Sequence, residues 1–228
     1  MTRVLAVLLV LAALGGWHWW TSERQVHRPP GIVAPDEPVQ VDLDPSQTFA
    51  ANGYTMVKRA RFDITARLLR KERYRIDAEA GLAPFDLGVG WGPLSDSEIL
   101  DQLEFSQMGR FFYWNPKRAD FPLSPRMMIT HLAQIHVIPA SADVAARLSS
   151  LRPGQVVSAH GFLVDVRGPG GFAWNISLRR DDTGGGVRLE VFDHVGRQYQ
   201  VEARVGKLDQ PGRDVQHYRF DPRGRDGD

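Results

Sequence analysis

The sequence contains no cysteine. This absence excludes disulfide bonds, zinc sites with cysteine ligands, iron–sulfur clusters and thiol catalysis. An excess of charge of one sign is also missing, because 28 Lys and Arg residues stand against 27 Asp and Glu residues, for a net charge of +1. No global electrostatic field would draw the chain to nucleic acid, so we expect no nucleic-acid partner. No internal repeat is visible, and the 228 residues, of which 43% are apolar, have the composition of a globular protein.

The N-terminus carries a run of 17 residues without a charged side chain, Val4–Trp20. As a helix this run would be about 25 Å long, close to the minimum that crosses a bilayer core. Trp17, Trp19 and Trp20 favour an uncleaved signal-anchor, because tryptophan prefers the membrane–water interface. We therefore predict that residues 1–22 form a single-pass anchor in the inner membrane, with the body in the periplasm or otherwise external. The alternatives are a cleaved signal peptide, which would give a secreted protein, and a buried helix of a soluble protein.

The rest of the chain divides by composition into three regions. Residues 23–48 are rich in proline and read as an extended linker, although the alternation of Val39, Val41 and Leu43 also fits an edge strand. Residues 49–207 form the globular domain. Residues 208–228 are polar, with balanced charges, and we predict a disordered tail.

Within the domain, period-two alternation and aromatic runs predict strands at 62–68, 111–114, 127–138, 155–166, 172–178, 187–191 and 199–205. Ser95 begins a capping box with Glu98 and Ser141 is a second N-cap, so two short helices are expected. Glycine and proline predict an irregular loop at 82–93, a bend at Gly161, and turns at 168–171, 181–186 and 193–196. The predicted fold class is α+β, with a mainly antiparallel sheet or a small OB-like barrel, preceded by an N-terminal hydrophobic helix.

Several motifs within residues 54–186 resemble a family of uncharacterised proteobacterial proteins with an N-terminal hydrophobic segment. The residues that carry this resemblance are 84–92 (PFDLGVGWG), 95–96, 100–103 (LDQL), 106–107, His131, 136–140 (HVIPA), 152–157 (RPGQVV), 161–164 (GFLV) and 181–184 (DDTG). The resemblance implies an envelope location and an α+β, OB-like body, and it implies no activity. Residues after Gly186 depart from the family pattern.

Six polar residues are weak candidates for catalysis: Asp86, Asp96, Asp101, Ser106, His131 and His136. The two histidines are five residues apart, so on one strand they would point to opposite faces and could not share a metal without a bulge. A triad of Ser106, His136 and Asp101 lacks the Gly-x-Ser-x-Gly context, and Ser106 reads instead as a residue that ends a helix. Structural roles are favoured for all six residues.

The remaining motifs predict neither a cofactor nor a metal. Gly88-x-Gly90-x-Gly92 lacks the strand–helix context and the lysine of a phosphate-binding loop. The stretch 181–186 lacks the distal glutamate of a calcium loop and reads as a hairpin turn.

Aromatic residues supply the candidates for ligand binding. The run Phe111–Trp114 on a strand would put two rings on each face, one pair for the core and one for a surface. The ligand-binding candidates are Trp91, Arg110, Tyr113 and Trp114, and a glycan or peptide is a better ligand than nucleic acid for an exported body.

Together these features predict a membrane-tethered envelope protein that is a non-enzymatic binding or assembly module for a protein or envelope component. The alternative is an envelope hydrolase with a carboxylate/histidine site, either with or without the assistance of a metal ion. An enzyme requires two or more of the polar candidates within hydrogen-bond reach in a cleft, whereas a binding module requires an exposed aromatic patch or an unpaired strand edge. An assembly subunit that oligomerises through a 187–205 hairpin is a third interpretation.

Overall fold

The computed structural model describes residues 24–176, 178 and 188–197, together with positions 4, 5, 9, 10 and 16. Within these residues, no helix has both the length and the apolar character to span a membrane. Several predictions fall on residues outside the described ones: the membrane-anchoring role of Trp17, Trp19 and Trp20, the disordered tail 208–228, the turn 181–186 and the strand 199–205. The elements are β1 Val39–Asp42, β2 Thr48–Ala51, β3 Tyr54–Arg73, β4 Phe85–Gly90, the 3-10 helix η1 Gly92–Ser95, α2 Ser97–Leu100, β5 Leu103–Met108, β6 Phe111–Pro116, α3 Pro125–His131, β7 Leu132–Pro139, α4 Ala142–Ser150, β8 Val156–Arg167, the 3-10 helix η2 Pro169–Gly171, β9 Ala173–Trp174 and β10 Arg188–Arg197.

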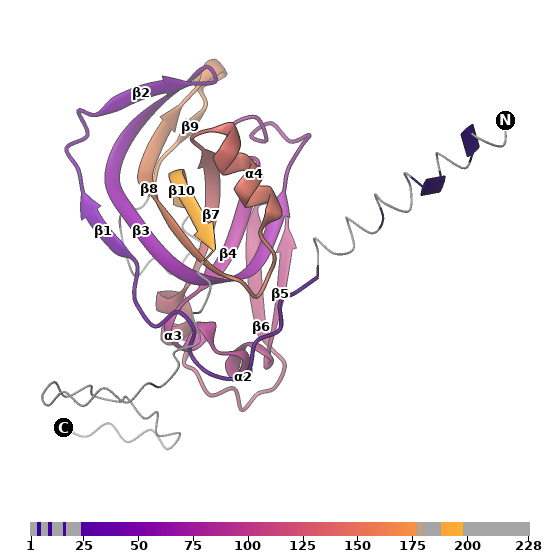
Figure 1. The fold of residues 1–228 in the computed structure, drawn as a ribbon. Coiled ribbons are helices and arrows are strands. Elements are labelled where there is room, and N and C mark those ends of the chain that lie inside the picture. The colour runs from indigo at the N-terminus through magenta and orange to yellow at the C-terminus, as the bar shows by residue number, and fades with distance from the viewer. Residues whose placement is uncertain are drawn as a thin grey trace, which may run out of the picture. The chain divides into compact units, whose positions relative to one another are not determined.

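The main sheet has the order β1-β3-β4-β7-β10-β8-β9, and β2 also pairs with β3 (Figure 1). Its described pairings are antiparallel except that β10 runs parallel to β7. Strand β8 pairs with β3 as far as Arg67, and β4 pairs with β3 from Arg67 onward. The sheet is not closed. The predicted α+β class with a mainly antiparallel sheet is therefore confirmed.

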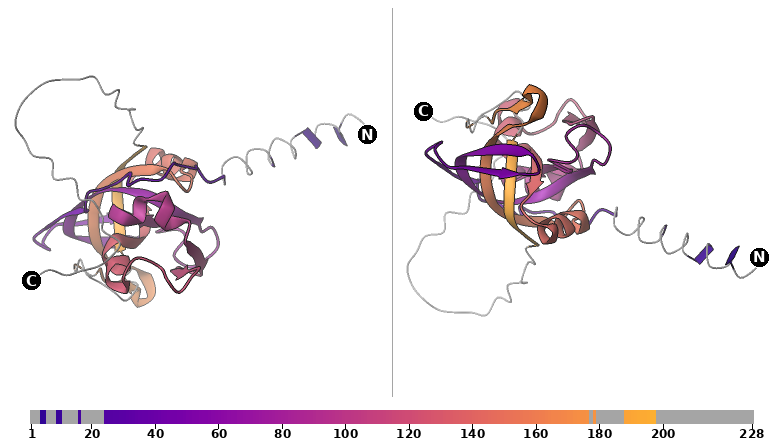
Figure 2. Two further views of the ribbon diagram at one scale, coloured as in Figure 1. Left: turned by 90° about the horizontal axis from the view of Figure 1, so that it is seen from below. Right: turned by 90° about the horizontal axis from the view of Figure 1, so that it is seen from above.

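The long curved strand β3 organises the domain (Figures 1 and 2). Its alternate residues Phe62, Ile64 and Leu68 are buried in the main core, as the period-two pattern predicts. The β2–β3 hairpin turns at Asn52-Gly53, which both have positive φ and so match the right-handed twist of the flanking strands. Helix α4, capped by Ser141 as predicted, packs its buried side against β7 and β10.

A second, two-stranded sheet formed by β5 and β6 lies beside the main sheet (Figure 1). We call it the β5–β6 hairpin. It packs on β4 at Gly88, where an added Cβ atom would lie 2.8 Å from the ring of Phe112. The absence of a side chain at Gly88 therefore lets the hairpin lie directly against the main sheet.

The N-terminal part of the predicted linker packs on the domain. The backbone N–H of Val26 donates to the carbonyl of Pro153, and Ala34 is fully buried. Farther along the chain, Val39–Asp42 pairs with β3, so the edge-strand alternative is confirmed for these residues. The proline-rich segment thus lies against the domain, where backbone N–H groups at Gly31, Val33 and Ala34 donate to the side chains of Asp96 and Ser95.

Of two sequence predictions between residues 82 and 106, the first is wrong and the second is confirmed only in part. The segment expected to be an irregular loop contains β4, whose six residues are all buried, because Gly88 and Gly90 admit close neighbours and do not break the strand. The short helix expected after Ser95 is present as α2, but Leu103 already begins β5, so Ser106 lies within a strand and does not end a helix.

Two more predictions fail farther along the chain. Residues 127–138 do not form one strand, because Ser124 caps a helix with proline at its start, and only residues 132–139 are extended. The turn expected at 193–196 is absent, since β10 continues through it with β8 as its partner.

Candidate functional site

A buried polar cluster lies between the main sheet and the β5–β6 hairpin. Its centre is Asp86 on β4, which faces His136 on β7 in the register of the two strands. The Nδ1–H of His136 donates to Oδ1 of Asp86 over 2.6 Å, and the two side chains are 1% and 0% exposed. The structure thus brings together two of the six catalytic candidates.

Three further donors complete the hydrogen bonding of the Asp86 carboxylate. Nη1 of Arg110 donates to Oδ1 at 3.2 Å, while the amide groups of Gln107 and Gln134 donate to Oδ2 at 3.1 and 3.3 Å. We call these five residues the Asp86 cluster. Gln107 and Arg110 belong to the β5–β6 hairpin, so the cluster joins the hairpin to the main sheet through a buried charge.

Arg110 sits at the hairpin turn and is held from several sides. Its guanidinium binds both carboxylate oxygens of Asp77 at 2.9 and 3.0 Å and donates to the carbonyl of Ala83. It also lies 4.1 Å from the ring centroid of Tyr74. A planar guanidinium that donates several hydrogen bonds fixes the orientation of the hairpin turn, which the ammonium group of a lysine could not do.

Aromatic rings enclose the cluster. Burial, and then the charge of Asp86, raise the pKa of Tyr74, so its hydroxyl stays protonated. That hydroxyl donates to the carbonyl of Gly109 and accepts from the amide of Gln107. The ring of Trp174 stacks on His136 with centroids 5.3 Å apart.

This arrangement is suited to holding the β5–β6 hairpin on the main sheet and poorly suited to catalysis. Both oxygens of Asp86 are occupied, and the carboxylate and imidazole are buried beneath the hairpin. Removal of a proton from a substrate requires an accessible base, and substrate access here would require the hairpin to leave.

The other catalytic candidates lie elsewhere in local structural roles. Asp96 caps α2, where its Oδ1 accepts from the N–H groups of Glu98 and Gly31. Ser95, the predicted cap, instead accepts from the N–H groups of Val33 and Ala34, so the chain entering the domain displaces the predicted capping box.

Asp101, Ser106 and His131 are likewise apart from Asp86. Asp101 follows α2 on the surface, Ser106 is exposed on β5, and His131 ends α3 with its ring 6.3 Å from that of Trp91. The two histidines are on different elements, so the reasoning about strand faces does not apply. Across the described part of the chain, no group of three or more His, Asp and Glu side chains is placed to hold a metal ion.

Sequence reasoning missed Tyr74, Gln107, Gln134 and Trp174 as members or neighbours of the cluster. Tyr74 directly follows β3, while Gln107, Gln134 and Trp174 lie on β5, β7 and β9, so only the pairing of these distant strands brings the four residues together. Arg110 was a ligand-binding candidate, but its side chain is engaged within the fold. Trp91, another candidate, is buried.

The aromatic run of β6 divides between two faces, as the alternation predicts. Phe112 and Trp114 are partly buried against the domain, and Phe112 stacks on Phe105. Phe111 and Tyr113 face outward with Met108 of β5, and the three side chains are 57%, 42% and 71% exposed. This outer face of the hairpin is an exposed apolar surface on a rigid support.

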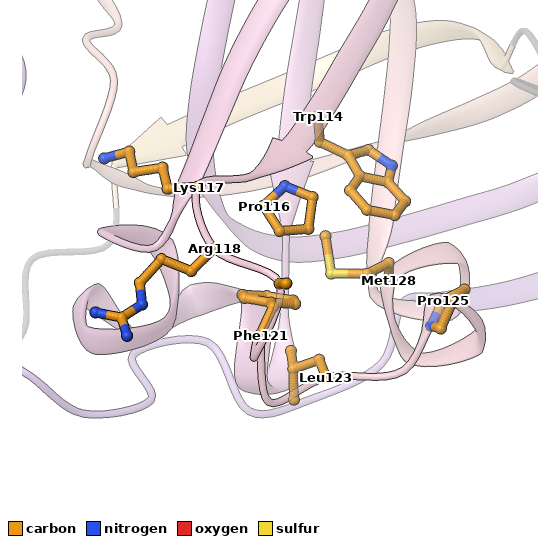
Figure 3. Close-up of a pocket in the computed structure, with 9 residues that line it drawn as sticks. Trp114, Pro116, Lys117, Arg118, Phe121, Leu123, Pro125 and Met128 are labelled. Atoms are coloured by element: carbon orange, nitrogen blue, oxygen red, sulfur yellow. The ribbon is translucent and has the colours of Figure 1, made fainter.

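A pocket of about 540 Å³ lies at the far end of the hairpin (Figure 3). Trp114, Phe121, Leu123 and Met128 supply its apolar wall. Lys117 and Arg118 extend to one side of it, away from Trp114. The candidate Trp114 therefore borders a pocket, with cationic side chains at the margin.

Comparisons of the chain with protein-family models, with curated proteins and with solved structures found no match.

Proposed function

We propose that the protein is a non-enzymatic binding module, tethered to the membrane by residues 1–22, that takes up a partner protein of the envelope on the outer face of the β5–β6 hairpin. The observation that carries the proposal is the set of Met108, Phe111 and Tyr113, exposed side by side on a two-stranded sheet. Contiguous exposed aromatic and methionine side chains are typical of protein-interaction surfaces.

Rigidity supports the same proposal. The Asp86 cluster and Phe112 hold the hairpin against β4, so the exposed face has one conformation before a partner arrives. A preorganised surface loses less conformational entropy on binding, which favours affinity. In the described residues β5 and β6 pair only with each other, so the hairpin also offers strand edges to an extended peptide.

The strand arrangement supports an open OB-like architecture. β3, β4 and β7 form a meander, α4 connects β7 to β8, and β10 enters between β7 and β8 parallel to β7. OB folds bind ligands on the face of their second and third strands, which correspond here to β4 and β7. The β5–β6 hairpin covers that face, so we propose that the hairpin takes over the role of presenting a binding surface.

The tether is consistent with how the chain enters the domain. Val26 is hydrogen-bonded to Pro153, and Arg28 donates to the carbonyl of Gly154. Val26 follows Trp20 by six residues, so at most about 22 Å of chain lies between the proposed interfacial tryptophan and the body. The body would therefore lie close to the membrane surface.

The proposal is tested by photo-crosslinking of the full chain in its native membrane. We expect Phe111→Ser and Tyr113→Ser each to lower the yield of a crosslinked partner about tenfold or more, because aromatic side chains at the centre of an interface carry much of its binding free energy. Val41→Ser is the matched control, since Val41 is exposed and apolar but lies on β1, which pairs with β3 and not with the hairpin.

Equal yields from the two hairpin variants and the parent chain would contradict the proposed surface. A chain lacking residues 1–20 is expected in the soluble fraction, and recovery of the intact parent protein from the soluble external fraction would contradict the tether.

A further inference from the structure

A second pocket, of about 430 Å³, lies between β3, the end of α2 and the start of β5. Four cationic side chains line it, Arg67, Arg70, Lys71 and Lys117, against two carboxylates, Glu72 and Asp101. The lining thus carries two more positive than negative charges in a confined space. A concave surface of one prevailing charge concentrates ions of the opposite sign.

Arg67 is the most informative of these residues. It is 3% exposed, and its Nη1 donates to the carbonyl of Ser95 and to the hydroxyl of Ser97, which are neutral acceptors. Burial, followed by the charge of Arg28, lowers the pKa of Arg67, and the carboxylates of Asp101 and Asp96 oppose this shift without cancelling it. The nearby negative charge therefore does not fully offset the cost of burying this cation.

Hydrogen-bond donors without an acceptor also indicate an anion site. The Nε groups of Arg67 and Arg70 are both buried and have no hydrogen-bond acceptor among the described residues. The nearest approach of Arg70 to a carboxylate is a long contact of 3.8 Å to Glu72. Lys117 donates to the backbone carbonyl of Asp101 and forms no ion pair within the described part of the chain. Two guanidinium groups and an ammonium group therefore border one space, and no described carboxylate lies closer to them than the 3.8 Å between Arg70 and Glu72.

We propose that this pocket binds a phosphate-type anion. Arginine is suited to phosphate because its planar donors match two oxygens at once, and lysine adds a point charge. The volume leaves room for a substituent on the phosphate, and Leu103 and Phe105 offer it apolar contacts. The anion is either a soluble phosphate compound or the headgroup of a phospholipid.

The headgroup source rests on the proposed membrane tether. Gln25 lines the pocket and follows Trp20 by five residues, so the two Cα atoms are at most about 18 Å apart. An anchored chain would thus hold the pocket near the phosphate layer of the bilayer. The soluble source does not depend on the tether.

The test is calorimetric titration of the full chain with inorganic phosphate in alkyl maltoside micelles, which contain no phosphate. We expect saturable binding, and we expect Arg70→Gln and Lys117→Gln each to weaken it about tenfold through the loss of a charge-assisted hydrogen bond. Arg118→Gln is the matched control, because it removes one charge at the adjacent position, where Arg118 pairs with Asp120 and borders the other pocket. This variant should bind within about twofold of the parent chain.

Absence of binding up to about 10 mM phosphate would overturn the proposal, as would equal weakening by Arg118→Gln and Lys117→Gln. The free energy of unfolding, measured without phosphate, shows that each variant is folded.

The source is decided by repeating the titration in nanodiscs of phosphatidylcholine alone and with phosphatidylglycerol. Loss of phosphate binding in either kind of disc, relative to the phosphate-free micelles, assigns the pocket to a lipid headgroup, and unchanged binding in both discs assigns it to a soluble phosphate compound. Phe111→Ser leaves Arg70 and Lys117 intact, so failure of partner capture is distinguishable from failure of this site.

Discussion

Asp86→Ala is expected to lower the free energy of unfolding by about 3–5 kcal/mol, the cost of removing one partner from a buried ion pair. The substitution leaves the buried imidazole of His136 without its acceptor and removes the carboxylate that Arg110, Gln107 and Gln134 share. Because two of these donors belong to the β5–β6 hairpin, the backbone N–H groups of β5 and β6 should also exchange faster with solvent. Urea unfolding and hydrogen exchange of the full chain in detergent micelles measure the two effects.

A surface ion pair provides the control for this substitution. Asp143 and Arg147 form a 2.8 Å pair on α4 with side chains 73% and 53% exposed. Asp143→Asn should cost less than about 0.5 kcal/mol, since solvent screens such pairs. An Asp86→Ala protein as stable as the Asp143→Asn protein would show that the Asp86 cluster does not fasten the hairpin.

Gly90→Ala is expected to lower the free energy of unfolding by about 1–3 kcal/mol through overpacking. An added Cβ atom would lie 2.4 Å from the carbonyl oxygen of Leu94, and a backbone atom in η1 cannot rotate away. The 3-10 helix η1 contains Ser95, which binds the incoming backbone at Val33 and Ala34, so a shift of η1 would disturb that contact as well. The midpoint of urea unfolding reports the effect.

Comparison of Gly88→Ala with Gly90→Ala distinguishes overpacking within the main domain from loss of contact between β4 and the hairpin. Gly88 lies on the same strand, but its added Cβ atom would meet the ring of Phe112, a side chain that can turn. We expect a smaller loss of overall stability than for Gly90→Ala, with faster hydrogen exchange confined to the hairpin. Identical stabilities and exchange patterns for the two variants would contradict the packing described for β4.

Particular residues explain which parts of the fold local sequence patterns predict and which parts they do not. The alternation in β3, the two-sided aromatic run of β6 and the Ser141 cap of α4 are local signals, and each is confirmed. β4 was missed because glycine is usually a strand breaker, whereas Gly88 and Gly90 here accommodate Phe112 and Leu94. Helix α3 was missed because Met127, Met128 and Ile129 are as acceptable in a strand as in a helix.

The candidate site was harder to predict from the sequence than the fold. The sequence indicates Asp86 and His136 as two of six catalytic candidates, but it does not indicate that these two side chains meet. The structure also pairs Asp86 with Arg110 and Gln134, which are 24 and 48 residues away. Both partners depend on strand register, which no local pattern records.

The sequence by itself determined the absence of cysteine chemistry, the near balance of charge, the apolar N-terminal run and the local strand and helix signals of β3, β6 and α4. Only the tertiary structure decided that Asp86 lies beneath a hairpin, that Phe111 and Tyr113 remain exposed, and that Arg67 is buried beside a pocket. The physical reason is that backbone conformation follows from neighbouring residues, whereas burial and ion pairing depend on which distant strands meet and in which register.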